Sequence, residues 1–164
     1  MEERSTAPMG LDLMRLRRGE ITLAVGAVIV LLGLFVPPWY AASDPTHEPT
    51  IGAGGSIPAS FGAWSGAGWL GTIGDLVILA AALFAIGTVL FGARGIEWDG
   101  SGNRVLCLAL AAVAVVVLRM IFPPSSMSGY AFDADLRLGI LVTLAGTLVL
   151  AWGAWRRRLP SPGP

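Results

Sequence analysis

Residues Ile21 to Tyr40 form a run of twenty residues without a single charged side chain. A helix rises about 1.5 Å per residue, so this run is long enough to cross the roughly 30 Å hydrocarbon core of a bilayer. Three further apolar stretches follow, at about 69–91, 105–122 and 138–155. With 54% hydrophobic and 13% charged residues among 164, the chain is too apolar for a water-soluble domain of its size. The sequence therefore predicts an all-α membrane protein, an antiparallel four-helix transmembrane bundle.

The segments between these stretches predict the domain organisation. Pro37 and Pro38 fit the end of the first helix, because proline lacks the backbone donor that a helix needs. Residues 41–68 are rich in Gly, Ser, Pro and Ala and form a long first loop, whereas the connector between the second and third stretches is short. We predict an N-terminal segment at 1–20, a four-span domain at 21–155 (first helix at 21–40) and a tail at 156–164.

The arginines predict the direction in which each helix crosses. All 11 basic residues are arginine: four precede the first stretch, two lie in the middle connector and three follow the last stretch. The other two loops contain only Arg137, at an edge. Because basic flanks stay in the cytoplasm, both termini are predicted to be cytoplasmic and the Gly-rich loop to face outwards. Six arginines are expected to lie at lipid headgroups: Arg15, Arg17, Arg18, Arg156, Arg157 and Arg158.

Glycines recur every seven residues in the first and last stretches. The first stretch and its flank contain Gly19, Gly26 and Gly33, and the last contains Gly139, Gly146 and Gly153. A seven-residue repeat keeps one narrow stripe towards a neighbouring helix, and glycine there permits close backbone approach. We expect these two helices to pack antiparallel along the stripes, with self-association as the alternative use of the same surface.

Two ionisable residues interrupt the predicted spans, Asp75 in the second and Arg119 in the third. Both lie near the outer end of their helix, so they are expected at similar depth. A charge inside hydrocarbon costs roughly 2.5–3.5 kcal/mol on insertion scales, and an ion pair would lower that cost for both residues. The alternatives are that Arg119 extends to the headgroups while Asp75 lies at the interface, or that both residues serve transport.

Residue patterns typical of catalysis or metal binding do not occur in the sequence. The single cysteine, Cys107, falls within the third apolar stretch, where a buried packing role is expected. The single histidine, His47, lies in the first loop beside Asp44 and Glu48, where solvation is favoured over a weak metal site. We therefore expect no enzyme activity, no cofactor and no structural metal, and the zero net charge indicates no nucleic-acid partner.

Several short segments carry a resemblance across nearly the whole chain. They are a span that ends in LFVPPWY, a loop with FGAW, a span that opens GTIGDLVILAAAL, an arginine just before FPP, and a fourth span ended by arginines. In this order they resemble the small uncharacterised four-span membrane proteins of actinobacteria, which implies a bacterial plasma-membrane location. The Trp-bearing loop is also similar to claudin-like topology, but the paired loop cysteines are missing and no function is carried over.

The function expected from these features is that of a non-catalytic accessory or scaffold subunit of a cell-envelope complex, with the long outer loop as its contact surface. Expected partners are membrane lipid and either another membrane protein or further copies of this chain. The alternative is a small oligomeric carrier or channel in which Asp75 and Arg119 line a polar path. A lipid-handling role is a third possibility, which rests on the apolar composition alone.

Overall fold

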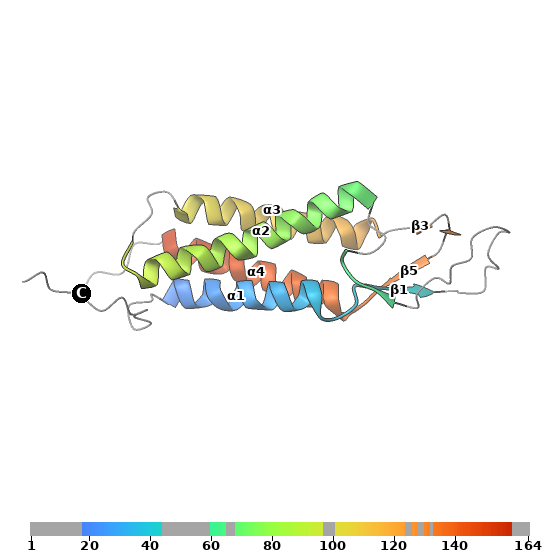
Figure 1. The fold of residues 1–164 in the computed structure, drawn as a ribbon, viewed down its shortest axis with the longest axis horizontal. Helices are drawn as coiled ribbons and strands as arrows, with labels where there is room; N and C mark the ends of the chain where they lie inside the picture. Colours follow the sequence, from blue (N-terminus) through green and yellow to red (C-terminus); the bar gives the residue numbers. More distant parts are fainter. Residues whose placement is uncertain are drawn as a thin grey trace, which may run out of the picture.

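The computed structural model describes residues 18–43, 60–64, 68–96, 101–123, 126–127, 130–131 and 133–158. Within them, four helices are long and apolar enough to cross a membrane. They are α1 (Arg18–Phe35), α2 (Gly68–Ala93), α3 (Ser101–Ile121) and α4 (Leu138–Arg158). The prediction of a mostly helical protein with four candidate spans is therefore confirmed (Figure 1).

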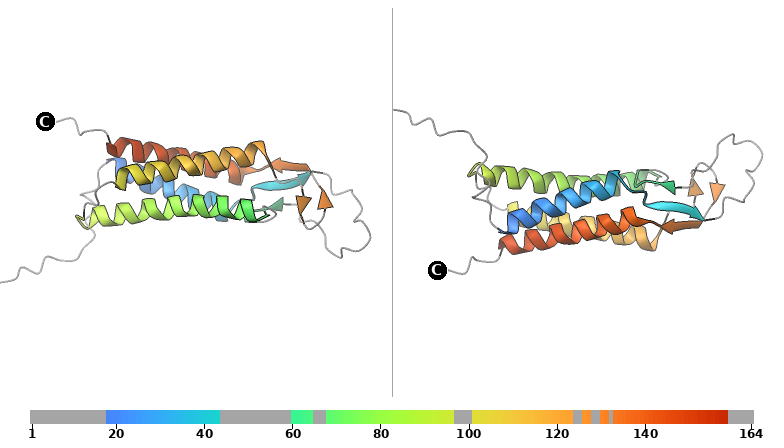
Figure 2. Two further views of the ribbon diagram at one scale, coloured as in Figure 1. Left: turned by 90° about the horizontal axis from the view of Figure 1, so that it is seen from above. Right: turned by 90° about the horizontal axis from the view of Figure 1, so that it is seen from below.

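The four helices run alternately up and down and form one bundle (Figures 1 and 2). Helix α1 packs against α2 and α4, and α3 packs against the same two helices, so α2 and α4 lie diagonally opposite and hardly touch. The contact between α1 and α4 is by far the most extensive. Because neighbouring helices are antiparallel, residues at the beginning of one helix lie level with residues at the end of the next.

Helix α1 ends five residues before the predicted limit at Tyr40. The last helical residue is Phe35, and the N–H of Val36 still donates to the carbonyl of Leu32 at 2.9 Å. Pro37 and Pro38 cannot donate and stop the helix there, so Tyr40 begins a strand. The other three helices are longer than predicted, because α2 covers Gly68–Ala93, α3 begins at Ser101 and α4 continues to Arg158 through the terminal arginines.

A small sheet at one end of the bundle was not predicted. Its strands are β1 (Tyr40–Ser43), β2 (Ser60–Phe61) and β5 (Asp133–Leu136), in the antiparallel order β2-β1-β5 with Tyr40 opposite Leu136. Two further strands, β3 (Ser126–Met127) and β4 (Tyr130–Ala131), form a hairpin. The sheet joins the segment after α1 to the segment before α4, and we call it, together with residues 62–64, the cap (Figure 1).

The bundle interior combines small side chains with large apolar ones, and many further large apolar side chains point outwards. Each of the four helices contributes at least one fully buried alanine, and Ala154 is the one on α4. By contrast Leu83 and Leu110 are each 54% exposed on the outer surface. Small residues at helix contacts and large apolar residues on the surface are the pattern of a bundle surrounded by lipid.

The glycine stripes lie in the contact between α1 and α4, as the seven-residue spacing predicts. A Cβ on Gly26 would lie 2.6 Å from the backbone nitrogen of Leu150, and one on Gly146 would lie 2.7 Å from that of Val30. The nearest neighbour of each of these two glycines is a larger residue of the other helix. The remaining contacts follow the same alternation, with Gly153 against Leu23, Gly33 against Thr143, and Gly139 against the Pro37–Pro38 segment. This alternation lets the two backbones approach without leaving a gap.

Candidate functional site

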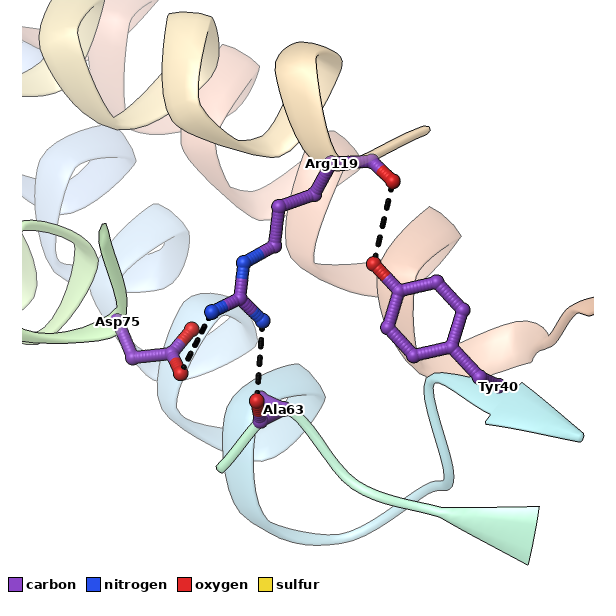
Figure 3. A network of polar contacts seen from close by, with 4 residues as sticks. All are labelled: Tyr40, Ala63, Asp75 and Arg119. Carbon is purple, nitrogen blue, oxygen red and sulfur yellow. Dashed lines mark hydrogen bonds and ion pairs between the residues drawn. The ribbon is translucent and has the colours of Figure 1, made fainter. Parts of the chain in front are cut away.

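Asp75 and Arg119 lie where the antiparallel helices α2 and α3 bring their cap ends level. Asp75 is about two turns into α2, and Arg119 is less than one turn before the end of α3. Nη2 of Arg119 lies 3.0 Å from Oδ2 of Asp75. The aspartate side chain is completely buried and that of the arginine is 11% exposed, so the guanidinium is directed towards the protein and not fully into the surroundings. The structure brings the two residues together as an ion pair (Figure 3).

The same guanidinium also binds the cap. Nη1 of Arg119 donates to the carbonyl oxygen of Ala63 at 2.9 Å, and Ala63 follows strand β2 and is fully buried. Arg119 therefore connects three parts of the chain: α3, which carries it, α2 through Asp75, and the cap through Ala63 (Figure 3). A hydrogen bond from a charged donor is stronger than one between neutral groups, so this connection has an energetic effect and is not only geometric.

Two aromatic residues after α1 complete the site. The guanidinium carbon of Arg119 lies 5.5 Å from the centre of the Trp39 ring, a distance typical of a cation–π contact. Trp39 donates through Nε1 to the carbonyl of Gly33 at 2.8 Å, and the hydroxyl of Tyr40 donates to the backbone carbonyl of Arg119 at 3.2 Å. Both aromatic side chains are buried, with Trp39 0% and Tyr40 1% exposed.

Burial also affects the acid–base chemistry of Tyr40. Removal from solvent raises the pKa of its hydroxyl above the ordinary value of 10.0, and the positive charge of Arg119 opposes this shift without cancelling it. The phenol is therefore neutral at physiological pH and can donate its proton to the Arg119 carbonyl.

One acceptor of the ion pair is left over. Oδ1 of Asp75 is buried and has no hydrogen-bond partner among the described residues. A buried acceptor without a partner costs about 1–3 kcal/mol, so it is a point at which a water molecule, a proton or an ion would be stabilised.

A groove of about 520 Å³ lies beside Arg119, between the cap ends of α2 and α3. Arg119 and Tyr40 are the lining residues with polar side chains. The other lining residues are apolar, and the larger of them are Leu70, Ile73, Val77, Val115, Leu118 and Phe122. Asp75 does not line the groove, so the positive member of the ion pair is the one that faces it.

A second ion pair lies at the opposite end of the bundle. Nη2 of Arg157 is 3.4 Å from Oε1 of Glu20, a residue that the sequence analysis did not single out. The glycine spacing could have predicted this ion pair. The antiparallel alignment that places Gly153 beside Leu23 also places the first turn of α1 beside Arg157. Arg157 is thus bound to protein, not only to headgroups.

The other predicted headgroup arginines have different surroundings. Arg156 and Arg158 are not buried, and Arg156 lies 5.9 Å from the ring centre of Trp152. Arg18 is exposed at the start of α1, and Arg15 and Arg17 lie outside the described residues. Exposed arginines beside an interfacial tryptophan fit a headgroup layer at this end of the bundle.

The expectation that Cys107 is buried was wrong: its side chain is exposed on α3. A thiol is small and weakly polar, so it is accepted on a lipid-facing surface as readily as in a core. His47, Asp44 and Glu48 lie outside the described residues. Within the part of the chain that the structure describes, no group of three or more His, Cys, Asp or Glu side chains is placed to hold a metal ion.

Comparisons of the chain with protein-family models, with curated proteins and with solved structures gave no match. The fold itself defines a class, that of multi-pass membrane proteins built on a four-helix bundle. Within that class, the Arg119 site is the feature of this chain that bears on function.

Proposed function

We propose that this protein is a non-catalytic integral membrane protein that acts as an accessory or scaffold subunit of a cell-envelope complex. In this proposal the cap is the surface that contacts the partner, and the ion pair of Asp75 and Arg119 holds the cap in a fixed position on the bundle. The observation that carries the proposal is the three-way connection made by Arg119 to α2, to α3 and to Ala63.

The ion pair supports a structural role more than a catalytic one. Arg119 uses its two terminal nitrogens on protein acceptors, and Trp39 covers the guanidinium face. Such an arrangement fixes a side chain, whereas a residue that carries a substrate has to change partners. Rigid presentation of a loop surface by a helical scaffold is a common basis of recognition.

The proposed location is the bacterial plasma membrane, with both termini and the connector after α2 in the cytoplasm. The arginine distribution supports this orientation, since the start of α1 and the arginine-rich end of α4 lie at the end of the bundle away from the cap (Figure 1). The partner is then expected on the outer side, within the membrane or just above it.

A small oligomeric carrier or channel is the second candidate. The orphan Oδ1 atom of Asp75 favours it, because a buried acceptor beside a cation is a place where a proton or ion would bind. In that case Asp75 and Arg119 would line a path that several copies of the chain form together.

Purification in mild detergent after cross-linking in native membranes separates the two candidates. The scaffold proposal predicts that a foreign membrane protein is cross-linked to the cap. The Arg119→Gln variant should lose this partner. The matched variant Arg157→Gln, which is altered at the other end of the bundle, should keep it. Recovery of a homo-oligomer alone, with ion flux in liposomes that Asp75→Asn abolishes, would refute the scaffold proposal and support the carrier.

A further inference from the structure

We propose that the groove between the cap ends of α2 and α3 is a binding site for one phospholipid, with an acyl chain along the groove and the lipid phosphate against the guanidinium of Arg119. The proposal is independent of the scaffold function, since α2 and α3 supply most of the groove lining and binding of a lipid there needs no protein partner of the cap.

The size and shape of the groove fit a lipid chain. Its volume of about 520 Å³ falls within the range of roughly 300–1,000 Å³ that is typical of sites for small ligands. It runs along α2 from Leu70 to Val77 and along α3 from Val115 to Phe122, which is about 10 Å, or two helical turns. Its rim is exposed, with Leu70 67% and Phe122 72% accessible, so the groove opens sideways to the surrounding lipid.

The polar wall distinguishes this groove from the rest of the lipid-facing surface. Arg119 lines it, while Asp75 lies outside it, so a ligand in the groove meets the positive end of the ion pair. The hydrogen bonds to Ala63 and Asp75 use two of the five N–H donors that a guanidinium has, so donors remain for a phosphate. Nε of Arg119 lies 4.0 Å from the position of a Cβ on Gly74, another residue of the groove lining.

Depth in the membrane agrees with this assignment. Arg119 lies less than one turn from the end of α3, the end at which we expect the headgroups of the cap-side leaflet, and the apolar lining continues from there towards the middle of the helix. A phospholipid in that leaflet has its phosphate near the membrane surface and its acyl chain towards the bilayer centre. The groove has the same order, with Arg119 near the end of α3 and the apolar residues further in. Guanidinium and phosphate are complementary in charge and in hydrogen-bond geometry.

Native mass spectrometry of the full chain tests the proposal. The protein is purified in mild detergent, loaded with dioleoyl phosphatidylglycerol or with dioleoylglycerol, which has no phosphate, and the fraction of protein with one bound lipid is measured. We expect a 1:1 complex with phosphatidylglycerol, retained at least tenfold better than dioleoylglycerol. Equal retention of the two lipids would overturn the assignment of the phosphate to Arg119.

Variants that fill the groove test its location without altering Arg119. Val77→Trp and Leu118→Trp add bulk from opposite walls, and each is expected to lower phosphatidylglycerol retention at least fivefold. Gly87→Leu is the matched control on α2, because no described atom lies within 4 Å of a Cβ at Gly87. Circular dichroism shows which groove variants fold. The proposal is overturned when the wild type retains no lipid, or when a folded groove variant retains as much lipid as Gly87→Leu.

Discussion

The coupling between Asp75 and Arg119 is the most direct test of the reasoning. Arg119→Leu leaves a completely buried carboxylate without its cation, and removal of one partner from a buried pair typically costs about 3–5 kcal/mol. Asp75→Asn keeps the shape of the side chain and leaves the guanidinium with only a neutral acceptor, so a loss of about 2–3 kcal/mol is expected. The double variant contains no unpaired charge and should be destabilised by less than the sum of the two single losses.

The coupling energy can be separated from that of an ordinary hydrogen bond. Interhelical hydrogen bonds between neutral groups in membranes average only about 0.6 kcal/mol in double-mutant cycles. We expect a coupling of about 2 kcal/mol or more for this pair, because both partners are desolvated. Loss of the Arg119 hydrogen bond to Ala63 occurs in both the single and the double variant, so it cancels in the cycle.

Reversible unfolding in mixed detergent micelles, followed by circular dichroism, measures each free energy of unfolding. The control cycle combines Asp75→Asn with Arg157→Leu, because Arg157 pairs with Glu20 at the other end of the bundle. The losses in the control cycle should add within about 0.5 kcal/mol. Additive losses for Asp75 and Arg119 themselves would show that the pair contributes no coupling and that the site is not an ion-paired anchor.

Three further predictions concern the glycine contact and the aromatic residues. Gly146→Ala places a Cβ 2.7 Å from the backbone of α1 and should destabilise the bundle by about 1–3 kcal/mol. Gly87→Ala meets open space and should be neutral or stabilising by up to about 1 kcal/mol. Thermal unfolding of the two variants tests this, and equal effects would contradict the close approach of α1 and α4. Trp39→Phe removes the 2.8 Å hydrogen bond to Gly33 and should lower the free energy of unfolding by about 1 kcal/mol, with unchanged stability as the contrary result. Burial raises the pKa of Tyr40, so the folded protein holds this proton more tightly than the unfolded chain; stability should be constant up to about pH 10.0 and fall above it. Unfolding measured against pH should show this decline in the wild type and a smaller one in Tyr40→Phe, and identical profiles would refute the assignment.

The helices and the ion pair could be identified from the sequence because both follow from one-dimensional signals. Uninterrupted apolar runs of this length have few alternatives to a membrane span, and antiparallel neighbours bring the end of one helix level with the beginning of the next. Asp75 and Arg119 therefore had to lie at similar depth. The seven-residue glycine spacing placed α1 against α4 by the same kind of reasoning.

The cap could not be predicted, and the reason is physical. Its strands are two to four residues long, too short for the alternation of apolar and polar residues that signals a strand. Their partners are distant in sequence, with Ala41 opposite Ser60 on one side and Asp135 on the other. Ala63 enters the site through a backbone carbonyl, which no residue type reveals, so the third partner of Arg119 became visible only in the structure.

The two sides of the bundle differ in a way that bears on function. On one side, glycines opposite larger residues bring α1 and α4 into continuous contact, so this pair has little room to move. On the other side, the cap ends of α2 and α3 leave a groove between them, beside which an ion pair joins the two helices. A ligand or partner that changes the structure should therefore act by separating α2 from α3 at Arg119. Such a separation would also release Ala63 and alter the cap, which couples the groove in the membrane to the surface outside it.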